Sequence, residues 1–221
     1  QTGSSGVSTL NTLAAGSTGT ITATLSGNSS QLSSLSTSGT SSVQNYTITV
    51  TSAVTTLIAV TIANATSAAT VDFSAAGISD TFGNIIANNG AGNALSTNAT
   101  NTIGKDADIN IAVTGTQADV SATNVTAINA LQAATTGGTV TATIDGNLAE
   151  LDDLNASGAS SKSTMALAIT VDDAASGSAG VTALNTISDA TTGTVTVASV
   201  SGTATELASL QSSGGSNATQ A

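Results

Sequence analysis

The residues of this chain that could carry chemistry are its carboxylates. Histidine and cysteine are absent and both basic residues are lysines, so there is no imidazole base, thiol nucleophile or guanidinium group. The adjacent pairs Asp152–Asp153 and Asp172–Asp173 could in principle hydrolyse a glycosidic bond. However, neighbours on a strand point to opposite faces, and sugar sites normally also use aromatic side chains, which make up 1% of the chain. We therefore expect no enzymatic activity and no catalytic residues.

Calcium is the other chemistry that these acids could support. The candidate ligands are hard carboxylate oxygens near expected strand ends: Asp106, Asp108, Asp152, Asp153, Asp172 and Asp173. No EF-hand loop or Gly-Gly-x-Gly-x-Asp nonapeptide is present, and the acids do not recur at a fixed position of a repeat. We expect no cofactor, with calcium kept as an alternative; the main interpretation is that the acids keep a sparsely charged surface soluble.

The charge balance excludes one class of partner. Against 13 acidic residues stand only Lys105 and Lys162, which gives a net charge of −11. Nucleic acids require many basic side chains and stacking rings, so we expect no nucleic acid partner. No run of eighteen apolar residues predicts a membrane span, and a start at Gln1 without a signal peptide indicates a processed or excised segment.

The apolar composition nevertheless indicates a folded chain. Hydrophobic residues make up 39% and the mean hydropathy is +0.27, unlike disordered chains. Nearly all of these residues are small or aliphatic, which favours many shallow core layers in a thin, elongated body. Without cysteine, disulfides cannot contribute.

Internal repetition is the strongest signal in the sequence. A first block, Val-x-x-Leu/Ile-Asn-x-Leu/Ile, occupies residues 7–13, 125–131 and 181–187. A second, threonine-rich block follows at residues 20–25, 139–144 and 194–197, and a third carries the leucine pairs Leu32/Leu35, Leu151/Leu154 and Leu207/Leu210. A fourth block appears at residues 46–50, 109–113 and 168–171. The order never changes, and the unit is about 56 residues long.

The blocks differ in hydrophobic period. Ile21, Ala23 and Leu25 alternate with threonines, which predicts a strand with one apolar face. The first and third blocks have apolar residues every three positions, which predicts short helices of two turns in the third block. Sequences typical of capping boxes, at residues 28–31, 147–150 and 203–206, precede those helices.

This alternation predicts an α/β fold, a repetitive solenoid of parallel strands and short helices. The alternative is an all-β array of sandwich-like modules, in which the leucine blocks would be loops. We divide one continuous solenoid into repeat unit 1 (1–53), degenerate unit 2 (54–106), unit 3 (107–180) and partial unit 4 (181–221). Unit 2 is expected to open at residues 54–57, to contain a strand at 70–73 and to carry a loop at 84–102.

Three short sequence segments resemble a known class of protein. They are Thr-Thr-Gly-Thr-Val-Thr-Val at 191–197, Ser-Gly-Thr-Ala-Thr-Glu-Leu at 201–207 and Ile-Thr-Val-Asp-Asp-Ala at 169–174. They resemble the very large Thr/Ala/Gly-rich repeat proteins on the surfaces of marine bacteria and cyanobacteria. The resemblance implies an extracellular or cell-surface location and a structural or adhesive role without a catalytic site.

The expected function is therefore structural. We expect part of an extracellular filament, sheath or surface layer, in which copies of the chain join end to end. The alternative is an adhesin arm or virus fibre whose binding depends on a glycan, such as a surface polysaccharide, or on calcium. Thr20, Thr22 and Thr24 also resemble the threonine ladders of ice-binding β-solenoids, but such rows fit the solvent face of any lysine-poor strand.

Overall fold

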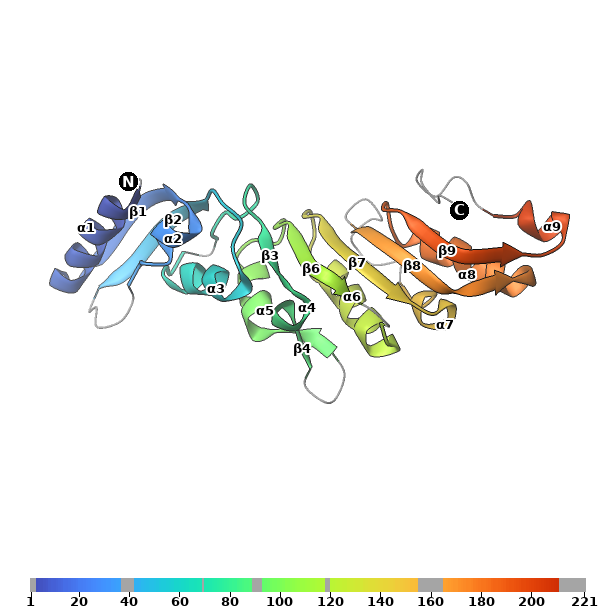
Figure 1. Ribbon diagram of the computed structural model, residues 1–221. Coiled ribbons are helices and arrows are strands. Elements are labelled where there is room, and N and C mark those ends of the chain that lie inside the picture. Colours follow the sequence, from blue (N-terminus) through green and yellow to red (C-terminus); the bar gives the residue numbers. More distant parts are fainter. Residues whose placement is uncertain are drawn as a thin grey trace.

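The computed structural model describes residues 3–36, 42–68, 70–88, 93–117, 120–154 and 165–210. They form an elongated body with the two chain ends at opposite extremities (Figure 1). The mixed α/β class is confirmed, because parallel strands alternate with helices along most of the chain. None of the described helices is long and apolar enough to cross a membrane.

The helices fall into two lengths. The longer ones are α1 (Gly3–Gly16), α3 (Thr56–Asn64), α5 (Thr97–Ile103), α6 (Ala122–Ala134) and α8 (Gly177–Asp189). Helices of four residues are α2 (Ser29–Leu32), α4 (Phe82–Ile85), α7 (Leu148–Leu151) and α9 (Ala204–Leu207). The leucine blocks thus form one turn of helix rather than the predicted two. They are helical all the same, so the all-β alternative is wrong.

The strands form one large sheet and two small ones. They are β1 (Thr20–Gly27), β2 (Val43–Val50), β3 (Ile78–Thr81), β4 (Ile86–Asn88), β5 (Asn93–Leu95), β6 (Ile111–Gln117), β7 (Val140–Gly146), β8 (Met165–Ser176) and β9 (Val195–Ser201). The large sheet has the order β3-β6-β7-β8-β9 and is parallel throughout. Strands β1 and β2 form a second parallel sheet, and β4 pairs antiparallel with β5.

Isolated bridges link the first sheet to the large one. Thr49 pairs with Asp72 and Val54 with Ile78, both in parallel. Residues 70–73 were predicted as a strand, but among them only Asp72 forms a bridge, because a turn at residues 74–76 interrupts the chain. The turn ends at Gly77, whose φ of 72° suits glycine and whose Cβ position would lie 2.8 Å from the Asn110 carbonyl oxygen.

The segment predicted as a loop, residues 84–102, is instead partly regular. It contains the end of α4, the β4–β5 hairpin and most of α5. Ile85, Ile86 and Ala99 are buried there, so a few apolar side chains in an Asn- and Ala-rich stretch suffice to anchor these elements. The division of the chain into four units stays a prediction.

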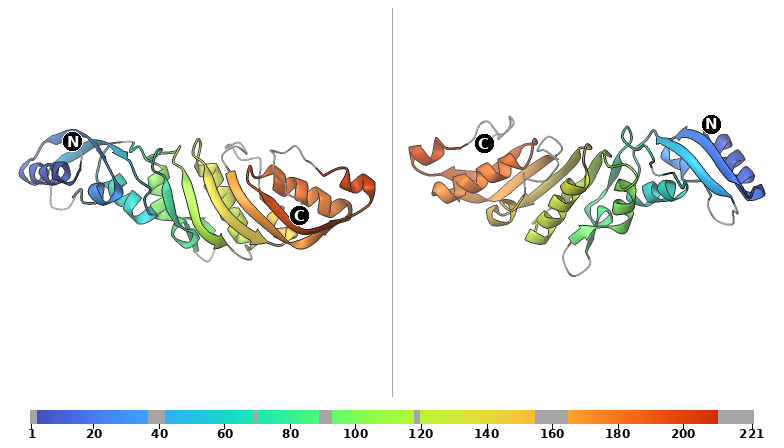
Figure 2. Two further views of the ribbon diagram at one scale, coloured as in Figure 1. Left: turned by 45° about the horizontal axis from the view of Figure 1, so that its top comes forward. Right: turned by 180° about the vertical axis from the view of Figure 1, so that it is seen from behind.

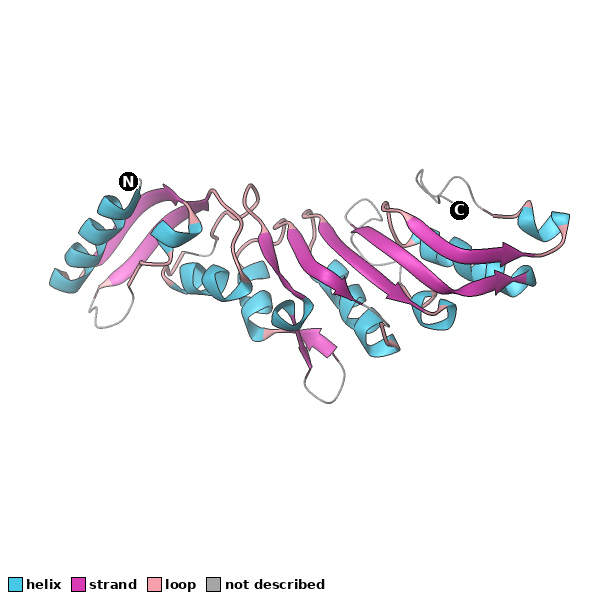
Figure 3. Cartoon of the chain, viewed as in Figure 1, coloured by secondary structure: helices cyan, strands magenta, loops and turns pink. Residues whose placement is uncertain are grey.

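The alternation of side chains places the core on one side of the sheet. In β7, Val140, Ala142 and Ile144 are buried while Thr141 and Thr143 are exposed. Helices α6 and α8 lie behind strands β6 to β9 in Figure 3 and come to the front when the molecule is seen from behind in Figure 2. The helices cover the apolar face, and threonines dominate much of the opposite one.

Spacing explains why long and four-residue helices alternate. Neighbouring strands lie about 4.8 Å apart, whereas packed helices need about 8–10 Å. In keeping with this, helices of 13 or 14 residues precede no two neighbouring strands among those described, whereas the shorter α3 and α5 precede β3 and β6, which pair directly. Contacts join α1 to α2, α2 to α3, α6 to α7, α7 to α8 and α8 to α9, so both kinds share one row. This spacing gives a physical reason for a repeat of two strands and two helices.

Candidate functional sites: an acidic junction and two open ends

The acidic junction lies between the first parallel sheet and the large one. Asp106 is buried there, and its Oδ2 accepts a hydrogen bond from the Phe73 amide at 2.5 Å. Asp72, Asp108 and Lys105 line the same open hollow of about 430 Å³. The Lys105 ammonium donates to the Ala68 carbonyl oxygen.

Two of the predicted acids share a proton at this junction. Burial, together with a hydrogen bond to Asp108, raises the pKa of Asp106 to about 6. The negative charges of Asp108 and Asp72 add to this rise. The same hydrogen bond lowers the pKa of Asp108, because Asp106 donates to its carboxylate. The pair therefore holds one proton in mildly acidic solution.

This proton makes the junction sensitive to pH. Because the pKa of Asp106 is raised on folding from 3.8 to about 6, its stabilising effect is complete below 3.8 and is lost as the pH rises through about 6. Asp106→Asn keeps a donor for Asp108 and an acceptor for Phe73 without the charge. The melting temperature of the parent chain, measured by circular dichroism, should fall between pH 4 and pH 7. That of the Asp106→Asn variant should fall much less. Asp153→Asn, at an exposed acid, should behave as the parent chain does, and an equal pH dependence in all three proteins would contradict the assignment.

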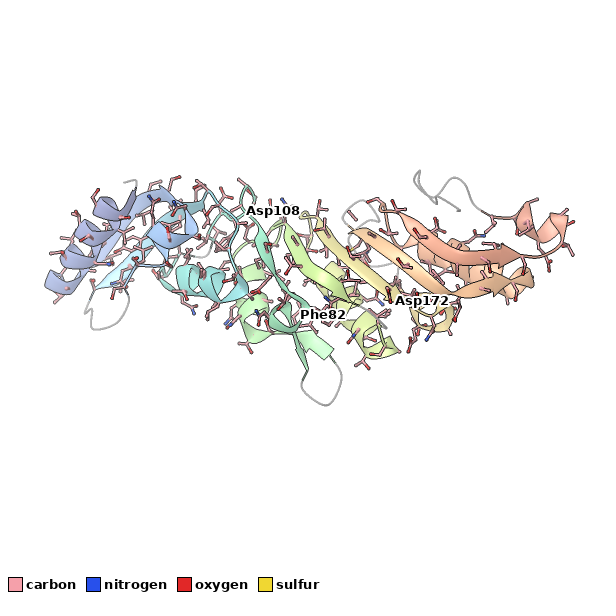
Figure 4. The ribbon with its side chains drawn as sticks, viewed as in Figure 1. Phe82, Asp108 and Asp172 are labelled. Atoms are coloured by element: carbon pink, nitrogen blue, oxygen red, sulfur yellow. The ribbon has the colours of Figure 1, made fainter. Side chains whose placement is uncertain are left out.

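The other predicted acids are not brought together with this junction. Asp173 accepts a hydrogen bond from the Leu148 amide at 3.1 Å, and Asp152 is the C-cap residue that follows α7. Figure 4 shows Asp108 and Asp172 well separated along the body. Among the residues that the structure describes, no group of three or more His, Cys, Asp or Glu side chains could hold a metal ion. The absence of catalysis and of a cofactor stays a prediction.

The N-terminal end face, formed by α1 and β1, exposes a residue that belongs to the core elsewhere. Leu13 is 52% exposed, whereas its equivalents in the repeat, Leu131 and Ile187, are 1% and 0% exposed. All three close the same Val-x-x-Leu/Ile-Asn-x-Leu/Ile block. The difference is that α6 and α8 are each preceded by other strands and helices. Leu13 therefore lies where a preceding element would cover it.

The glycines that precede the strands are crowded inside the stack and uncrowded at the N-terminal end face. A Cβ at Gly138 would lie 1.8 Å from the Ile109 carbonyl oxygen, and one at Gly193 would lie 2.1 Å from the Leu167 carbonyl oxygen. At Gly19, which precedes β1, the nearest atom would be Ser17 Oγ at 3.9 Å. Among the described residues, no strand approaches Gly19 as these strands approach Gly138 and Gly193.

The hydroxyl groups of Thr191 and Ser17 also differ between the inside of the stack and the N-terminal end face. The Thr191 hydroxyl accepts from the Leu167 amide at 2.8 Å, donates to the Leu167 carbonyl oxygen at 2.9 Å and accepts from the Gly193 amide at 2.9 Å. Ser17 is its equivalent and also accepts, at 3.2 Å, from the amide of Gly19. Ser17 thus repeats the local bond of Thr191 on a face where no strand corresponding to β8 precedes it.

The C-terminal end face, formed by β9 and α9, has a matching feature. Leu207 is 37% exposed, whereas its equivalents Leu32 and Leu151 are 2% and 0% exposed. Each of the three is the last residue of a four-residue helix. A following long helix contacts α2 and α7, and none follows α9 in the part of the chain that is described.

An asparagine in each first block bonds successive helices together. Asn11 donates to the Ser34 carbonyl oxygen at 2.8 Å, Asn129 to that of Asp153 at 3.0 Å and Asn185 to that of Ser209 at 3.0 Å. In each case the acceptor lies just after the next four-residue helix. No role was predicted for these asparagines, although they occupy the same position in each first block of the sequence.

No family model, curated protein or solved structure matches the chain. Function must therefore be argued from the two end faces and the surfaces between them.

Proposed function

We propose that this chain is a structural segment of an extracellular filament, sheath or surface layer, built as a solenoid that continues beyond both described ends. The observation that carries the proposal is the exposure of Leu13 and Leu207, whose repeat equivalents are core residues. A position that is buried inside a stack of repeats and exposed at its end marks a face that a further unit could cover. The partners are copies of the same chain, and no cofactor takes part.

The order of the strands supports continuation. In the large sheet each strand pairs in parallel with its successor in the sheet order, and β9 pairs only with β8 among the described strands. Strand β1 likewise pairs only with β2 among the described strands. Free parallel edges at both extremities are templates for further pairing, and identical repeats stack in one direction without a built-in stop.

The distribution of charge favours joining head to tail. The first charged side chain in the sequence is Asp72, so the N-terminal end face carries none. All 13 acids follow, and Glu206 lies in α9 on the C-terminal end face. Two C-terminal faces would repel each other, whereas a neutral face against an acidic face does not. A heterologous contact of this kind generates a filament rather than a closed dimer.

Electron microscopy tests the proposal. We expect the concentrated full chain to form long particles with a constant axial spacing, either alone or with an added strand, a peptide copy of β8 (Met165–Ser176) that can pair with the edges of β1 and β9. Leu13→Asp should abolish them, because the substitution places a charge where an apolar contact forms. Leu57→Asp is the matched control, since Leu57 is 65% exposed but lies on α3 within the body. Particles of one chain length at every concentration, with and without the added strand, would contradict the proposal.

A binding module, such as an adhesin arm or virus fibre, is the second candidate. Exposed threonines face one another across strands, as Thr24 with Thr47 and Thr170 with Thr196. Such a polar face offers hydroxyl groups to a surface polysaccharide. An array of polysaccharides and ions, calcium included, separates the two candidates, because a purely structural segment should bind none of them specifically.

A further inference from the structure

We propose that each end of this fold is completed by one added extended strand with an apolar residue at every second position, parallel to its neighbours, and that this strand joins successive copies. This inference rests on the proposed end-to-end assembly and specifies its joint. It follows from the two kinds of strand, from the spacing of the helices and from the open positions on both end faces.

The strands differ in what precedes them. Strands β1, β7 and β9 follow the long helices α1, α6 and α8, and we call them long-helix strands. Strands β2 and β8 follow the four-residue helices α2 and α7, and we call them short-helix strands. Long-helix and short-helix strands alternate in the pairs β1–β2, β7–β8 and β8–β9. Strands β3 and β6 belong to neither kind, because they follow helices of nine and seven residues, and β6 pairs with both β3 and β7. Both end strands, β1 and β9, are long-helix strands.

Direct pairing of the two end strands would place helices of 14 and 13 residues before adjacent strands, which no described pair of strands shows; β6 and β7 pair directly, but the helices before them have seven and 13 residues. If β9 of one copy paired with β1 of the next, α1 of that copy would lie one strand spacing, about 4.8 Å, from α8. Packed helices require about 8–10 Å. One strand inserted between β9 and β1 doubles the separation to about 9.6 Å, which is the separation expected for α6 and α8, two strands apart. We therefore place a short-helix strand at the joint.

Strand β8 shows how such a strand binds on both sides. Its first half pairs with β7, with Val140 opposite Met165 and Thr141 opposite Ala166. Its middle pairs with β9, with Thr170 opposite Thr196. By equivalence in the repeat, an added strand should place its position 166 opposite Thr196 on the C-terminal end face and its position 170 opposite Thr22 on the N-terminal one.

The open positions on the N-terminal end face match this occupant. The missing neighbour of Gly19 and Ser17 is the strand that approaches Gly193 and bonds Thr191, which is β8. The buried side chains of that strand alternate along it: Met165, Leu167, Ile169 and Val171. An added strand with this pattern would continue the core and cover the apolar edge.

Disulfide cross-linking tests the inference, because the chain has no cysteine of its own. The full chain carries Thr22→Cys or Thr196→Cys, both on the exposed face. A peptide of residues 165–176 carries Thr170→Cys or Ala166→Cys. We expect Thr22→Cys to cross-link at least tenfold faster with the Thr170→Cys peptide, and Thr196→Cys at least tenfold faster with the Ala166→Cys peptide. The two sites in the peptide are four residues apart, about 13 Å along a strand, so each serves as the control for the other.

A second control removes the apolar pattern. Peptides that also carry Leu167→Ser and Ile169→Ser should cross-link at the rate of free cysteine. Equal rates for both cysteine positions, a reversed preference or rates no higher than those of the serine peptides would overturn the inference.

The result is separable from that of the proposed function. Long particles without register-specific cross-links leave the assembly standing and reject the added strand. Cross-links in the expected register, without long particles in the presence of the peptide, confirm the strand site and reject the filament.

Discussion

Leu151→Ala is expected to lower the free energy of unfolding by about 2–5 kcal/mol, whereas Leu207→Ala should lower it by less than about 1 kcal/mol. Both leucines end a four-residue helix at the same position of the repeat. Leu151 is fully buried, so truncation removes apolar contacts and leaves a cavity. Leu207 already faces solvent in the single chain and leaves none.

Urea unfolding followed by circular dichroism measures the pair under identical conditions. The comparison is matched in residue type, helix length and repeat position, so only the presence of a following helix differs. Equal losses in the two variants would mean that α9 is covered as α7 is, and would contradict an open C-terminal end face.

The second large loss of stability is expected on substitution of Gly193. Gly193→Ala should lower the free energy of unfolding by about 3 kcal/mol or more, because its Cβ meets the backbone of β8 rather than a flexible side chain. Gly19→Ala, at the equivalent position, should change the free energy of unfolding by less than about 1 kcal/mol, and we expect this small change to be stabilising. Gly19 has open space and no positive φ.

Gly19→Ala has an additional use. In the assembled state the added strand would approach Gly19 as β8 approaches Gly193, so a variant that is neutral in the single chain should still prevent assembly. Thermal unfolding measures the stability of the variant, and electron microscopy shows whether it assembles. A variant that is stable and assembles normally would contradict the close approach.

The sequence predicted the parts of the fold that depend on local pattern. Alternation in residues 20–25 predicted β1, and the capping boxes predicted at residues 28–31 and 203–206 are present with both reciprocal bonds. Apolar residues every three positions predicted helices but not their lengths. Those lengths follow from the distance between strands, which is a property of the packed sheet.

The parts that the sequence analysis missed depend on contacts between distant residues. The burial of Asp106 beside Phe73 joins residues 33 positions apart, and nothing in the local pattern of Asp106-Ala-Asp108 indicated a shared proton. The β4–β5 hairpin formed where Asn, Gly and Ala suggested a loop, because Ile86 pairs with Leu95. The open end faces became visible only when equivalent positions could be compared for burial.

Leu13 lies on the surface that the proposed assembly would cover. Thiol labelling of Leu13→Cys, in a chain without other cysteines, measures this directly. We expect rapid labelling in dilute solution and at least tenfold slower labelling in assembled particles, with Leu57→Cys labelled equally fast in both. Labelling of Leu13→Cys that stays as fast in the particles as in dilute solution would contradict the claim.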